Sequence, residues 1–313
     1  MSNSKKAIFM GTPDFAVESL KQLLEDGIEI AAVITAPDRK SGRGQKISMS
    51  AVKQFALAKE LPILQPEKFK NDEFLNELKA FNADLFIVVA FRMLPEVVWA
   101  MPELGTINLH GSLLPNYRGA APINWAVING EKETGVTTFF IEKEIDTGKI
   151  IDREAICIND TDNAGTIHDK LMVVGANLLS KTVQSIFKGT ATALPQDNSN
   201  LKHAPKIFKG DCKIDWTLDT ITIHNKIRGL SPYPTAWAQL AQDDSKKTIK
   251  LFNTSYLLDN KNNSNQIKLE EKQIFFGTAD GWIILKDVQL EGKKRMEITA
   301  LMNGFDFSKW ILN

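Results

Sequence analysis

The sequence predicts an α/β fold: a doubly wound N-terminal domain built on a mostly parallel sheet, followed by a small C-terminal β-barrel (OB-like) domain. Two observations support this prediction. Up to Gly135, short apolar runs alternate with stretches of helical periodicity, a pattern typical of βαβ units and a parallel sheet. From Thr235 onwards, strand-like segments follow one another with turn residues between them, as in a small barrel.

The N-terminal elements alternate in a regular order. Strands are expected at residues 6–10, 30–35, 61–64, 85–90 and 106–110. Helices are expected at residues 14–26, 50–60, 71–81 and 94–102. The run at 85–90 is apolar almost throughout, as strands covered on both faces are. Sheets of this kind bind ligands beyond the carboxyl ends of their strands, so residues that end these runs are candidate site residues.

After Gly135 the pattern changes. Residues 136–160 predict a strand, a turn and a second strand, and a helix is expected over 166–188. A polar, aperiodic stretch follows, and the strands beyond it include a hairpin signal at Asp280–Gly281. The expected domains are a catalytic domain over residues 1–189, a linker over 190–209 and a β-barrel domain over 210–313.

The composition excludes several classes of protein. The chain has 313 residues, no net charge and 24% charged residues, which is ordinary for a soluble protein. Two cysteines argue against a disulfide scaffold, and Cys157, in an alternating run, is expected to be a core thiol. The four histidines share no ligand spacing, so no metal is expected. Without a membrane-length apolar run or a secretory signal, we expect a cytoplasmic protein with no membrane partner.

The segment INLHGSLLPNYRGAAPINW, residues 107–125, carries the clearest chemical signal. Asn108 and His110 are two residues apart on an expected strand and therefore project to the same side, at its carboxyl end. An amide can donate to a developing oxyanion and an imidazole can move a proton, which suits acyl transfer. On spacing alone, a hydrogen-bonded edge histidine beside a structural asparagine is the simpler interpretation.

Two further stretches are candidates for the same site. Asp146 lies in EIDTGKI, an ordinary turn sequence, and becomes catalytic only if that turn folds back toward His110. In SLLPNYRGAAPI, Pro115 fixes its own φ and biases Leu114 toward an extended conformation. The backbone of so stiff a loop can hold a heteroaromatic ring by hydrogen bonds, with the leucines as an apolar wall.

These motifs resemble those of the formyltransferases that use 10-formyltetrahydrofolate. The likeness to the family rests on NLHGSLLPNYRGAAPINWAVINGEKETGVT from Asn108 and on DTG from Asp146. Further stretches resemble the branch that acts on methionyl-tRNA: GTPDFA from Gly11, APDRKSGRG from Ala36, ISMSAVKQFA from Ile47, IDW from Ile214 and IRGLSPYPTAW from Ile227. The resemblance covers nearly the whole chain, and it departs at Phe91 and Arg92, where the family often has a tyrosine-glycine pair.

The resemblance implies an enzyme that transfers the formyl group of 10-formyltetrahydrofolate to the α-amino group of methionyl-initiator tRNA for translation initiation. It implies that Asn108, His110 and Asp146 are the catalytic residues. It also implies a C-terminal barrel that helps to hold tRNA, and no metal. The residues expected to line the folate site are Ser112, Leu113, Leu114 and Pro115.

The stretch PDRKSGRGQK, residues 37–46, is basic and contains two glycines. Its acidic residue is Asp38, and its cations are Arg39, Lys40, Arg43 and Lys46. It is either a solvated loop or a segment that becomes ordered on the acceptor end of tRNA, with the cations at phosphates. These four cations are therefore the candidate tRNA-binding residues.

Parts of the sequence are also compatible with three other functions. The closest is the same chemistry on a nucleotide-linked amino sugar, since such enzymes share HGSLLPxYRG and NGExETGVT. The basic stretch and the C-terminal barrel favour tRNA over the sugar. A nucleic-acid-binding module with a degenerate enzyme domain is disfavoured by the intact Asn108, His110 and Asp146. A serine hydrolase is disfavoured because Ser112 lacks the G-x-S-x-G setting.

Overall fold

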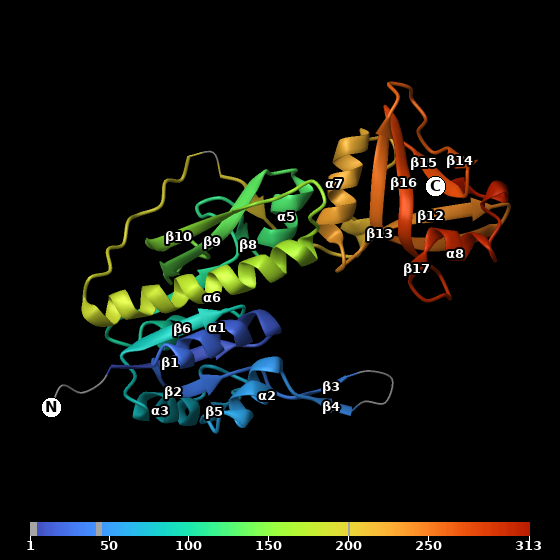
Figure 1. Cartoon of the computed structure of the whole chain (residues 1–313). Coiled ribbons are helices and arrows are strands. Elements are labelled where there is room, and N and C mark those ends of the chain that lie inside the picture. Colours follow the sequence, from blue (N-terminus) through green and yellow to red (C-terminus); the bar gives the residue numbers. More distant parts are fainter. Residues whose placement is uncertain (1–4, 42–45, 200) are drawn as a thin grey trace. The chain divides into compact units, whose positions relative to one another are not determined.

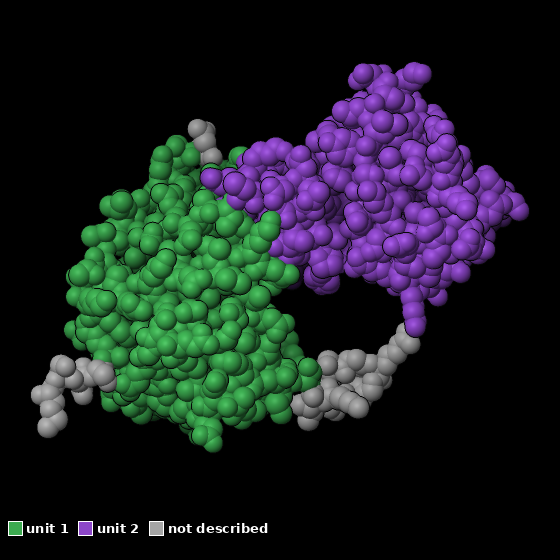
Figure 2. Space-filling model, in the orientation of Figure 1, with its two compact units in different colours: residues 1–119, 135–156, 168–203 green, residues 120–134, 157–167, 204–313 purple. Residues whose placement is uncertain are grey.

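A computed structural model describes residues 5–41, 46–199 and 201–313 of the chain. The chain divides into two compact units, shown in different colours in Figure 2. Unit 1 comprises residues 1–119, 135–156 and 168–203, and unit 2 comprises residues 120–134, 157–167 and 204–313. The domain boundaries expected from the sequence, 1–189, 190–209 and 210–313, stay a prediction.

Unit 1 is built on a seven-stranded sheet with the order β10-β9-β7-β6-β1-β2-β5, and Figure 1 labels these strands apart from β7. The strands are β1 (Lys6–Gly11), β2 (Glu29–Ile34), β5 (Ile63–Leu64), β6 (Leu85–Val89), β7 (Thr106–His110), β9 (Glu133–Phe140) and β10 (Ile150–Cys157). The run from β7 to β5 is parallel, and β9 is antiparallel to β7. The prediction of a mostly parallel sheet is therefore confirmed.

Helices cover both faces of this sheet. They are α1 (Asp14–Glu25), α2 (Ala51–Ala58), α3 (Asp72–Ala80), α4 (Glu96–Trp99) and α6 (Ala164–Lys188). On one face, Phe86 and Val88 of β6 share a buried apolar cluster with residues of α3 and α4. On the other face, Gly175 of α6 lies against Leu109 of β7, where an added Cβ would come within 2.9 Å of the leucine. Burial of strand residues on both sides explains why β6 is apolar at every position.

Unit 2 contains an antiparallel sheet that curls into a half-barrel, with the order β14-β15-β16-β13-β12-β18 and β17 beside β16. Its strands are β12 (Ala236–Gln242), β13 (Ser245–Leu258), β14 (Ile267–Glu270), β15 (Gln273–Gly277), β16 (Gly281–Leu290), β17 (Met296–Glu297) and β18 (Ile311–Leu312). The register between β13 and β16 shifts between Leu251 and Thr254, and such bulges bend a strand. The predicted C-terminal β architecture is confirmed.

Shorter elements complete the chain. The helices of unit 2 are α5 (Pro122–Ile128), α7 (Thr220–Leu230) and α8 (Ile298–Met302), with single 3-10 turns at Gly210–Cys212 and Phe307–Lys309. Two small two-stranded sheets pair β3 (Arg39–Ser41) with β4 (Lys46–Ser48) and β8 (Arg118–Gly119) with β11 (His203–Ala204). Among the helices in the described part of the chain, none has a stretch long and apolar enough to cross a membrane.

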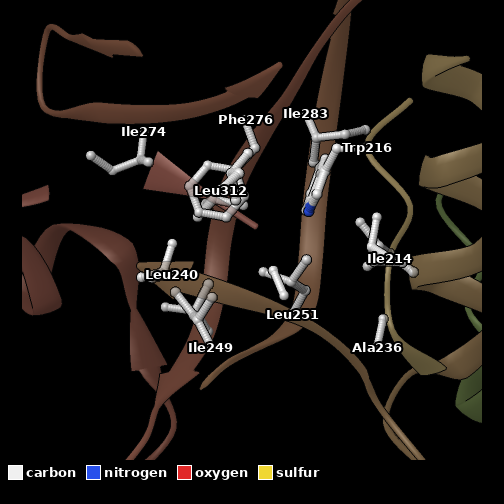
Figure 3. Close-up of a cluster of buried hydrophobic side chains, with 14 of the residues drawn as sticks. Ile214, Trp216, Ala236, Leu240, Ile249, Leu251, Ile274, Phe276, Ile283 and Leu312 are labelled. Atoms are coloured by element: carbon white, nitrogen blue, oxygen red, sulfur yellow. The ribbon is translucent and has the colours of Figure 1, made fainter. Parts of the chain in front are cut away.

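The core of unit 2 is a cluster of apolar side chains inside the half-barrel, of which Figure 3 labels ten. Trp216 packs edge-to-face on Phe276, with ring centroids 5.2 Å apart and planes at 89°. Along residues 213–216, exposed and buried side chains alternate, as they do in a strand: Lys213 and Asp215 are exposed, and Ile214 and Trp216 are buried. It runs beside β12, since the Ile214 amide donates to the Trp237 carbonyl at 3.0 Å.

Residues 122–128 form helix α5, with Pro122 in its first turn, where proline is compatible with a helix. Helix α1 begins at Asp14, as expected, with Pro13 as its N-cap residue and no side-chain cap. The expectation for Cys157 was wrong. Cys157 is exposed, because β10 is the edge strand and most of its residues face solvent despite the alternating sequence.

Candidate active site

Asn108 and His110 lie on β7 and share one face of the sheet. Asn108 is in register with Val88 of β6, and Val88 belongs to the apolar cluster under α3 and α4. Leu109 between them faces α6 instead. The two polar side chains therefore leave the strand on the face opposite α6, at its carboxyl end, about 7 Å apart along the strand.

Both nitrogens of the buried His110 ring face an oxygen acceptor. Nε2 lies 2.9 Å from the carbonyl oxygen of Tyr117, and because a carbonyl can only accept, Nε2 carries the hydrogen. Nδ1 lies 3.8 Å from Oδ2 of Asp146, and the two side chains are 8% and 12% exposed. The ring also packs edge-to-face on Phe139 of β9, at 6.4 Å between centroids. These contacts fix both the orientation of the ring and the hydrogen on Nε2.

The Asp146 carboxylate is placed by the turn that connects β9 to β10. Its Oδ2 accepts a hydrogen bond from the backbone N–H of Gly119 at 2.9 Å. Asp146 has φ of 56°, in the left-handed region that most residues avoid. Two residues on, an added Cβ at Gly148 would lie 1.7 Å from the carbonyl oxygen of Phe140, so only glycine fits there. The glycine of Asp-Thr-Gly is thus required by the shape of this turn.

Asn108 has an amide that no other described residue engages. The residue is half-buried, and while its backbone belongs to the β-sheet, no hydrogen bond joins its side-chain amide to the described residues. An amide in this setting can donate to a ligand oxygen. With the imidazole and the carboxylate, the site therefore contains a group that can donate to an oxyanion, a group that can move a proton and a group that can orient the imidazole. Such a set is suited to acyl transfer. The assignment of Asn108, His110 and Asp146 as catalytic residues stays a prediction.

The loop after His110 is held rigid from inside. Ser112 is fully buried, and its Oγ donates to the carbonyl oxygen of Asn116 at 2.7 Å. Leu114 is fully buried as well, and its N–H donates to Oγ1 of Thr137 at 3.0 Å. Its carbonyl oxygen accepts from Arg153 at 2.9 Å. The side chains of Ser112 and Leu114 therefore face the interior of unit 1.

Leu113 and Pro115 are the members of the expected folate-binding set whose side chains are only half-buried. Leu113 packs on the backbone at Gly135, where an added Cβ would come within 2.5 Å of its side chain. A stiff loop that presents two apolar side chains beside His110 fits a heteroaromatic ligand. The assignment of Ser112, Leu113, Leu114 and Pro115 to a folate site stays a prediction.

At residues 91–92, where the sequence departs from the family pattern, Arg92 binds the loop that follows β5. Its guanidinium stacks over the Phe69 ring at 4.0 Å and donates to the carbonyl oxygens of Pro66 and Glu67. Burial lowers the pKa of the Arg92 guanidinium, and the charge of Arg39 lowers it further. Arg92 thus has a packing role that the tyrosine-glycine pair of the family would not supply.

The basic stretch begins and ends in the paired strands β3 and β4. Arg39 is exposed at the start of β3, while Lys40 and Lys46 belong to β3 and β4. Arg43 lies outside the described residues. Asp38 accepts from Lys53 at 2.6 Å and from Gln65 at 2.9 Å, and these bonds lower the pKa of its carboxyl group. The acidic side chain of this stretch is therefore neutralised by a lysine from α2. The tRNA-binding assignment stays a prediction.

Sequence reasoning missed the residues that hold the site together. Tyr117 and Gly119 bind His110 and Asp146 through backbone groups, and backbone contacts leave no side-chain signature. The glycine of Tyr-Arg-Gly was the available signal, since its φ of 124° requires glycine. In the described part of the chain, no group of three or more His, Cys, Asp or Glu side chains is arranged to hold a metal ion.

Comparison with known families defines the class of protein. The model described as "Formyl transferase" matches residues 5–183, and "Formyl transferase, C-terminal domain" matches residues 206–306. The chain belongs to the formyl transferase family. Its curated relatives include the methionyl-tRNA formyltransferase of Azobacteroides pseudotrichonymphae, 54% identical over 320 residues and covering 97% of both chains. That of Parabacteroides distasonis is 52% identical and covers 96% of this chain and 95% of the relative.

Solved structures support the fold. A sugar 3N-formyl transferase crystallised in the presence of dTDP and 5-N-formyl-THF has a TM-score of 0.66 at 23% identity, covering 94% of this chain and 100% of that one. An N-formyltransferase from Helicobacter canadensis with folinic acid and dTDP-3-aminofucose has a TM-score of 0.65 at 21% identity, covering 93% and 100%. At these identities the likeness shows a common fold.

Proposed function

We propose that the protein transfers the formyl group of 10-formyltetrahydrofolate to the α-amine of methionyl-initiator tRNA, and so acts in translation initiation. The observation that carries this proposal is the distance of 3.8 Å between Nδ1 of His110 and Oδ2 of Asp146. The contact lies at the carboxyl end of β7, the strand that also bears Asn108. The near-full-length methionyl-tRNA formyltransferase relatives support the choice of substrate. We place the activity in the cytoplasm, where translation takes place.

The nucleophile needs little activation, so the proposed mechanism centres on moving a proton. A free α-amine has a pKa of about 7.7–8.0, and an adjacent ester withdraws electrons and lowers it, so much of the amine is neutral near pH 7. Bound 10-formyltetrahydrofolate supplies a formyl carbon attached to a nitrogen that leaves poorly unless it is protonated. The enzyme must therefore carry a proton from the attacking amine to that nitrogen.

His110 is the proposed proton carrier, acting at Nδ1. Because Nε2 is held by the Tyr117 carbonyl oxygen, Nδ1 is the ring nitrogen that can gain and lose a proton without breaking an existing bond. Asp146 faces that atom and stabilises the positive charge that develops on the ring. Asn108 donates to the oxygen that gains negative charge during the transfer.

The nucleic acid would be held outside this site by positive charge. We propose that Arg39, Lys40, Arg43 and Lys46 contact phosphates of the tRNA and that the C-terminal domain, residues 210–313, contributes to tRNA binding. The exposure of Arg39 and the pairing of Asp38 with Lys53 support this assignment, because the segment keeps a positive charge. Such contacts predict that tRNA binding weakens as salt rises.

One incubation tests the proposed function. The protein is mixed with 10-formyltetrahydrofolate and either methionyl-initiator tRNA or a dTDP-linked amino sugar, and formyl transfer to each is measured. We expect formyl-methionyl-tRNA and no formylated sugar, with the tRNA reaction slowed by added salt. Formylation of the sugar alone would replace the proposal by the amino-sugar alternative, which shares the fold of the solved relatives.

A further inference from the structure

The segment that follows α6 is bonded into unit 1 beside the Asp146 turn. Leu194 and Ile150, the first residue of β10, exchange two backbone hydrogen bonds, both 2.8 Å long. This brings Gln196, which is half-buried, to the outer side of the turn. The stretch expected to be a linker, residues 190–209, therefore contains residues that reach the active-site loops.

The amide of Gln196 makes four hydrogen bonds. Its Nε2 donates to the carbonyl oxygens of Asp146 and Gly148, both at 2.8 Å. Its Oε1 accepts from Nε and Nη2 of Arg118, at 3.1 and 2.6 Å. The opposite orientation of the amide would place its oxygen against two carbonyl oxygens and its NH2 group against a guanidinium. The network therefore admits a single orientation of the amide.

Arg118 lies between the two residues that hold the catalytic side chains. Tyr117 accepts from Nε2 of His110, and Gly119 donates to Oδ2 of Asp146. The Arg118 guanidinium also donates to Oδ1 of Asn198 at 2.9 Å. Residues 117–119 thus connect three groups: Tyr117 binds His110, Arg118 binds Gln196, and Gly119 binds Asp146. Gln196 in turn donates to the backbone of the Asp146 turn.

The turn is also restrained by the Gly119 N–H, which donates to the Asp146 carboxylate, and by Oγ1 of Thr147, which donates to the carbonyl oxygen of Glu144 at 3.1 Å. Asp146 itself has a left-handed backbone conformation, which glycine adopts readily and aspartate only occasionally. The neighbouring Ile145 is 59% exposed, so packing does not fix the turn on that side. The Gln196 amide joins the carbonyl groups on both sides of Thr147 and so keeps the turn in the shape that directs the carboxylate to His110.

We propose that Gln196 is a positioning residue for Asp146, oriented by Arg118, in the formyl transfer reaction. The proposal rests on the proposed function for its kinetic consequence. Gln196 contacts neither His110 nor the reacting groups, and it acts by holding the Asp146 carboxylate near Nδ1 of His110. Loss of its two donated bonds displaces that carboxylate.

The test uses the full-length protein carrying Gln196→Glu. Glutamate keeps the pairing with Arg118 but replaces the donor NH2 by an oxygen that repels both carbonyl groups. We expect kcat for methionyl-tRNA formylation to fall on the order of 10- to 100-fold, with the KM values of both substrates little changed. Gln196→Met, which removes the hydrogen bonds without adding charge, should show the same kcat defect, and thermal melting verifies folding of each variant.

Asn198→Ala is the matched control. It removes the other acceptor of the Arg118 guanidinium without touching the turn, and we expect near wild-type kcat. The second arm combines Gln196→Glu with Asp146→Ala. If Gln196 acts through Asp146, its substitution lowers the rate of that variant by less than about twofold, the error of an additive cycle. A full additional loss in the double variant, or wild-type kcat in folded Gln196→Glu, overturns the proposal.

A third arm does not depend on turnover. In protein labelled with [15N]histidine, the His110 nitrogen signals report the hydrogen on Nε2 and the surroundings of Nδ1. We expect Gln196→Glu to shift the Nδ1 signal and Asn198→Ala to leave it in place; an unchanged Nδ1 signal in Gln196→Glu contradicts the positioning role. If the wild type formylates no methionyl-tRNA, the proposed function fails, and this arm still decides whether Gln196 positions Asp146.

Discussion

The half-barrel core of unit 2 and the active-site loops of unit 1 are stabilised in opposite ways. The core is a cluster of buried apolar side chains drawn from many parts of unit 2, among them Trp216 and Phe276, which are labelled in Figure 3. The loops of the candidate active site depend on a few directional bonds, such as those from Nε2 of His110 to the Tyr117 carbonyl and from the Gly119 N–H to Asp146. Substitutions in the core should therefore lower stability, whereas substitutions at the loops should lower the rate in a folded protein.

His110→Ala should give the largest effect on the rate. Removing a general acid or base typically lowers the rate about 10²- to 10⁴-fold, and the proposed mechanism gives His110 both proton transfers. The buried ring packs on Phe139 and donates to the Tyr117 carbonyl, so its removal should also cost some stability, and the rate is therefore measured on the folded fraction. The measurement is kcat/KM for methionyl-tRNA formylation beside a thermal melt. If the variant kept more than about a third of the wild-type rate, the role of His110 would be wrong.

Asn108→Ala should come next. Loss of one oxyanion donor lowers kcat about 10²- to 10³-fold. Because the Asn108 amide has no partner among the described residues, its removal leaves no buried group unsatisfied, and stability should be unchanged. Single-turnover rates at saturating substrate separate this effect from binding. An equal rise in KM with kcat intact would assign Asn108 to substrate binding instead.

Gly148→Ala tests the link between the turn and the rate. The new methyl group would overlap the Phe140 carbonyl oxygen, at 1.7 Å, so the turn must move and carry Asp146 with it. A misplacement of about 1 Å can lower a rate about 10²-fold. The matched control is Gly210→Ala, because an added Cβ there meets nothing within 4 Å. Wild-type kinetics in Gly148→Ala would show that the position of Asp146 does not matter for the reaction.

Much of the fold could be predicted because its signals are local. The uniformly apolar β6 indicated a buried parallel strand, and Asp280–Gly281 marked the β15–β16 hairpin that the structure contains. Cys157 could not be placed, because alternation does not reveal which strand lies at the edge of a sheet. Helix α5 was hidden by the glycines and prolines that precede it.

The geometry of the site depends on contacts between distant parts of the chain. Asn108 and His110 could be paired because they share a strand, but nothing local in Asp-Thr-Gly shows that its carboxylate returns to His110. The Gln196 amide meets the turn from 50 residues away in the sequence, in a polar stretch without periodicity. The position of the Asp146 carboxylate is therefore determined by the folded unit and cannot be predicted from local sequence patterns.

Trp216→Ala should separate stability from rate on the core side of the comparison. Truncating a large buried aromatic side chain typically lowers the free energy of unfolding by about 3–5 kcal/mol. Trp216 is 2% exposed and packs edge-to-face on Phe276, so the half-barrel should lose stability by that order. Urea unfolding gives the change, and kcat measured on the folded fraction should stay near wild type. A large fall in kcat without loss of stability would contradict the expectation that substitutions in this core act on stability and not on the rate.

A smaller effect, on stability, should come from the titration of His224, an imidazole on α7 that packs against β13 of the half-barrel. Burial, helped by the charges of Arg228 and Lys286, lowers the pKa of His224 from 6.5 to about 4, and Asp160 opposes the shift. The ring lies 4.9 Å from the Tyr256 ring between centroids, and Nδ1 lies 3.2 Å from Oγ1 of Thr254. The folded protein therefore favours the neutral imidazole.

The sign of the pH dependence follows from this shift. Between pH 6.5 and about 4 the unfolded chain binds a proton at His224 that the folded chain does not, so stability falls as the pH falls through this window. The loss should reach about 2–3 kcal/mol near pH 4. Urea unfolding of the wild type and of His224→Gln, which cannot titrate, isolates the effect from the carboxylates. His203→Gln, at an exposed position, is the control and should follow the wild type. A constant difference between wild type and His224→Gln across pH 4 to 7 would mean that His224 titrates alike in both states, and that packing against this half-barrel does not disfavour charge.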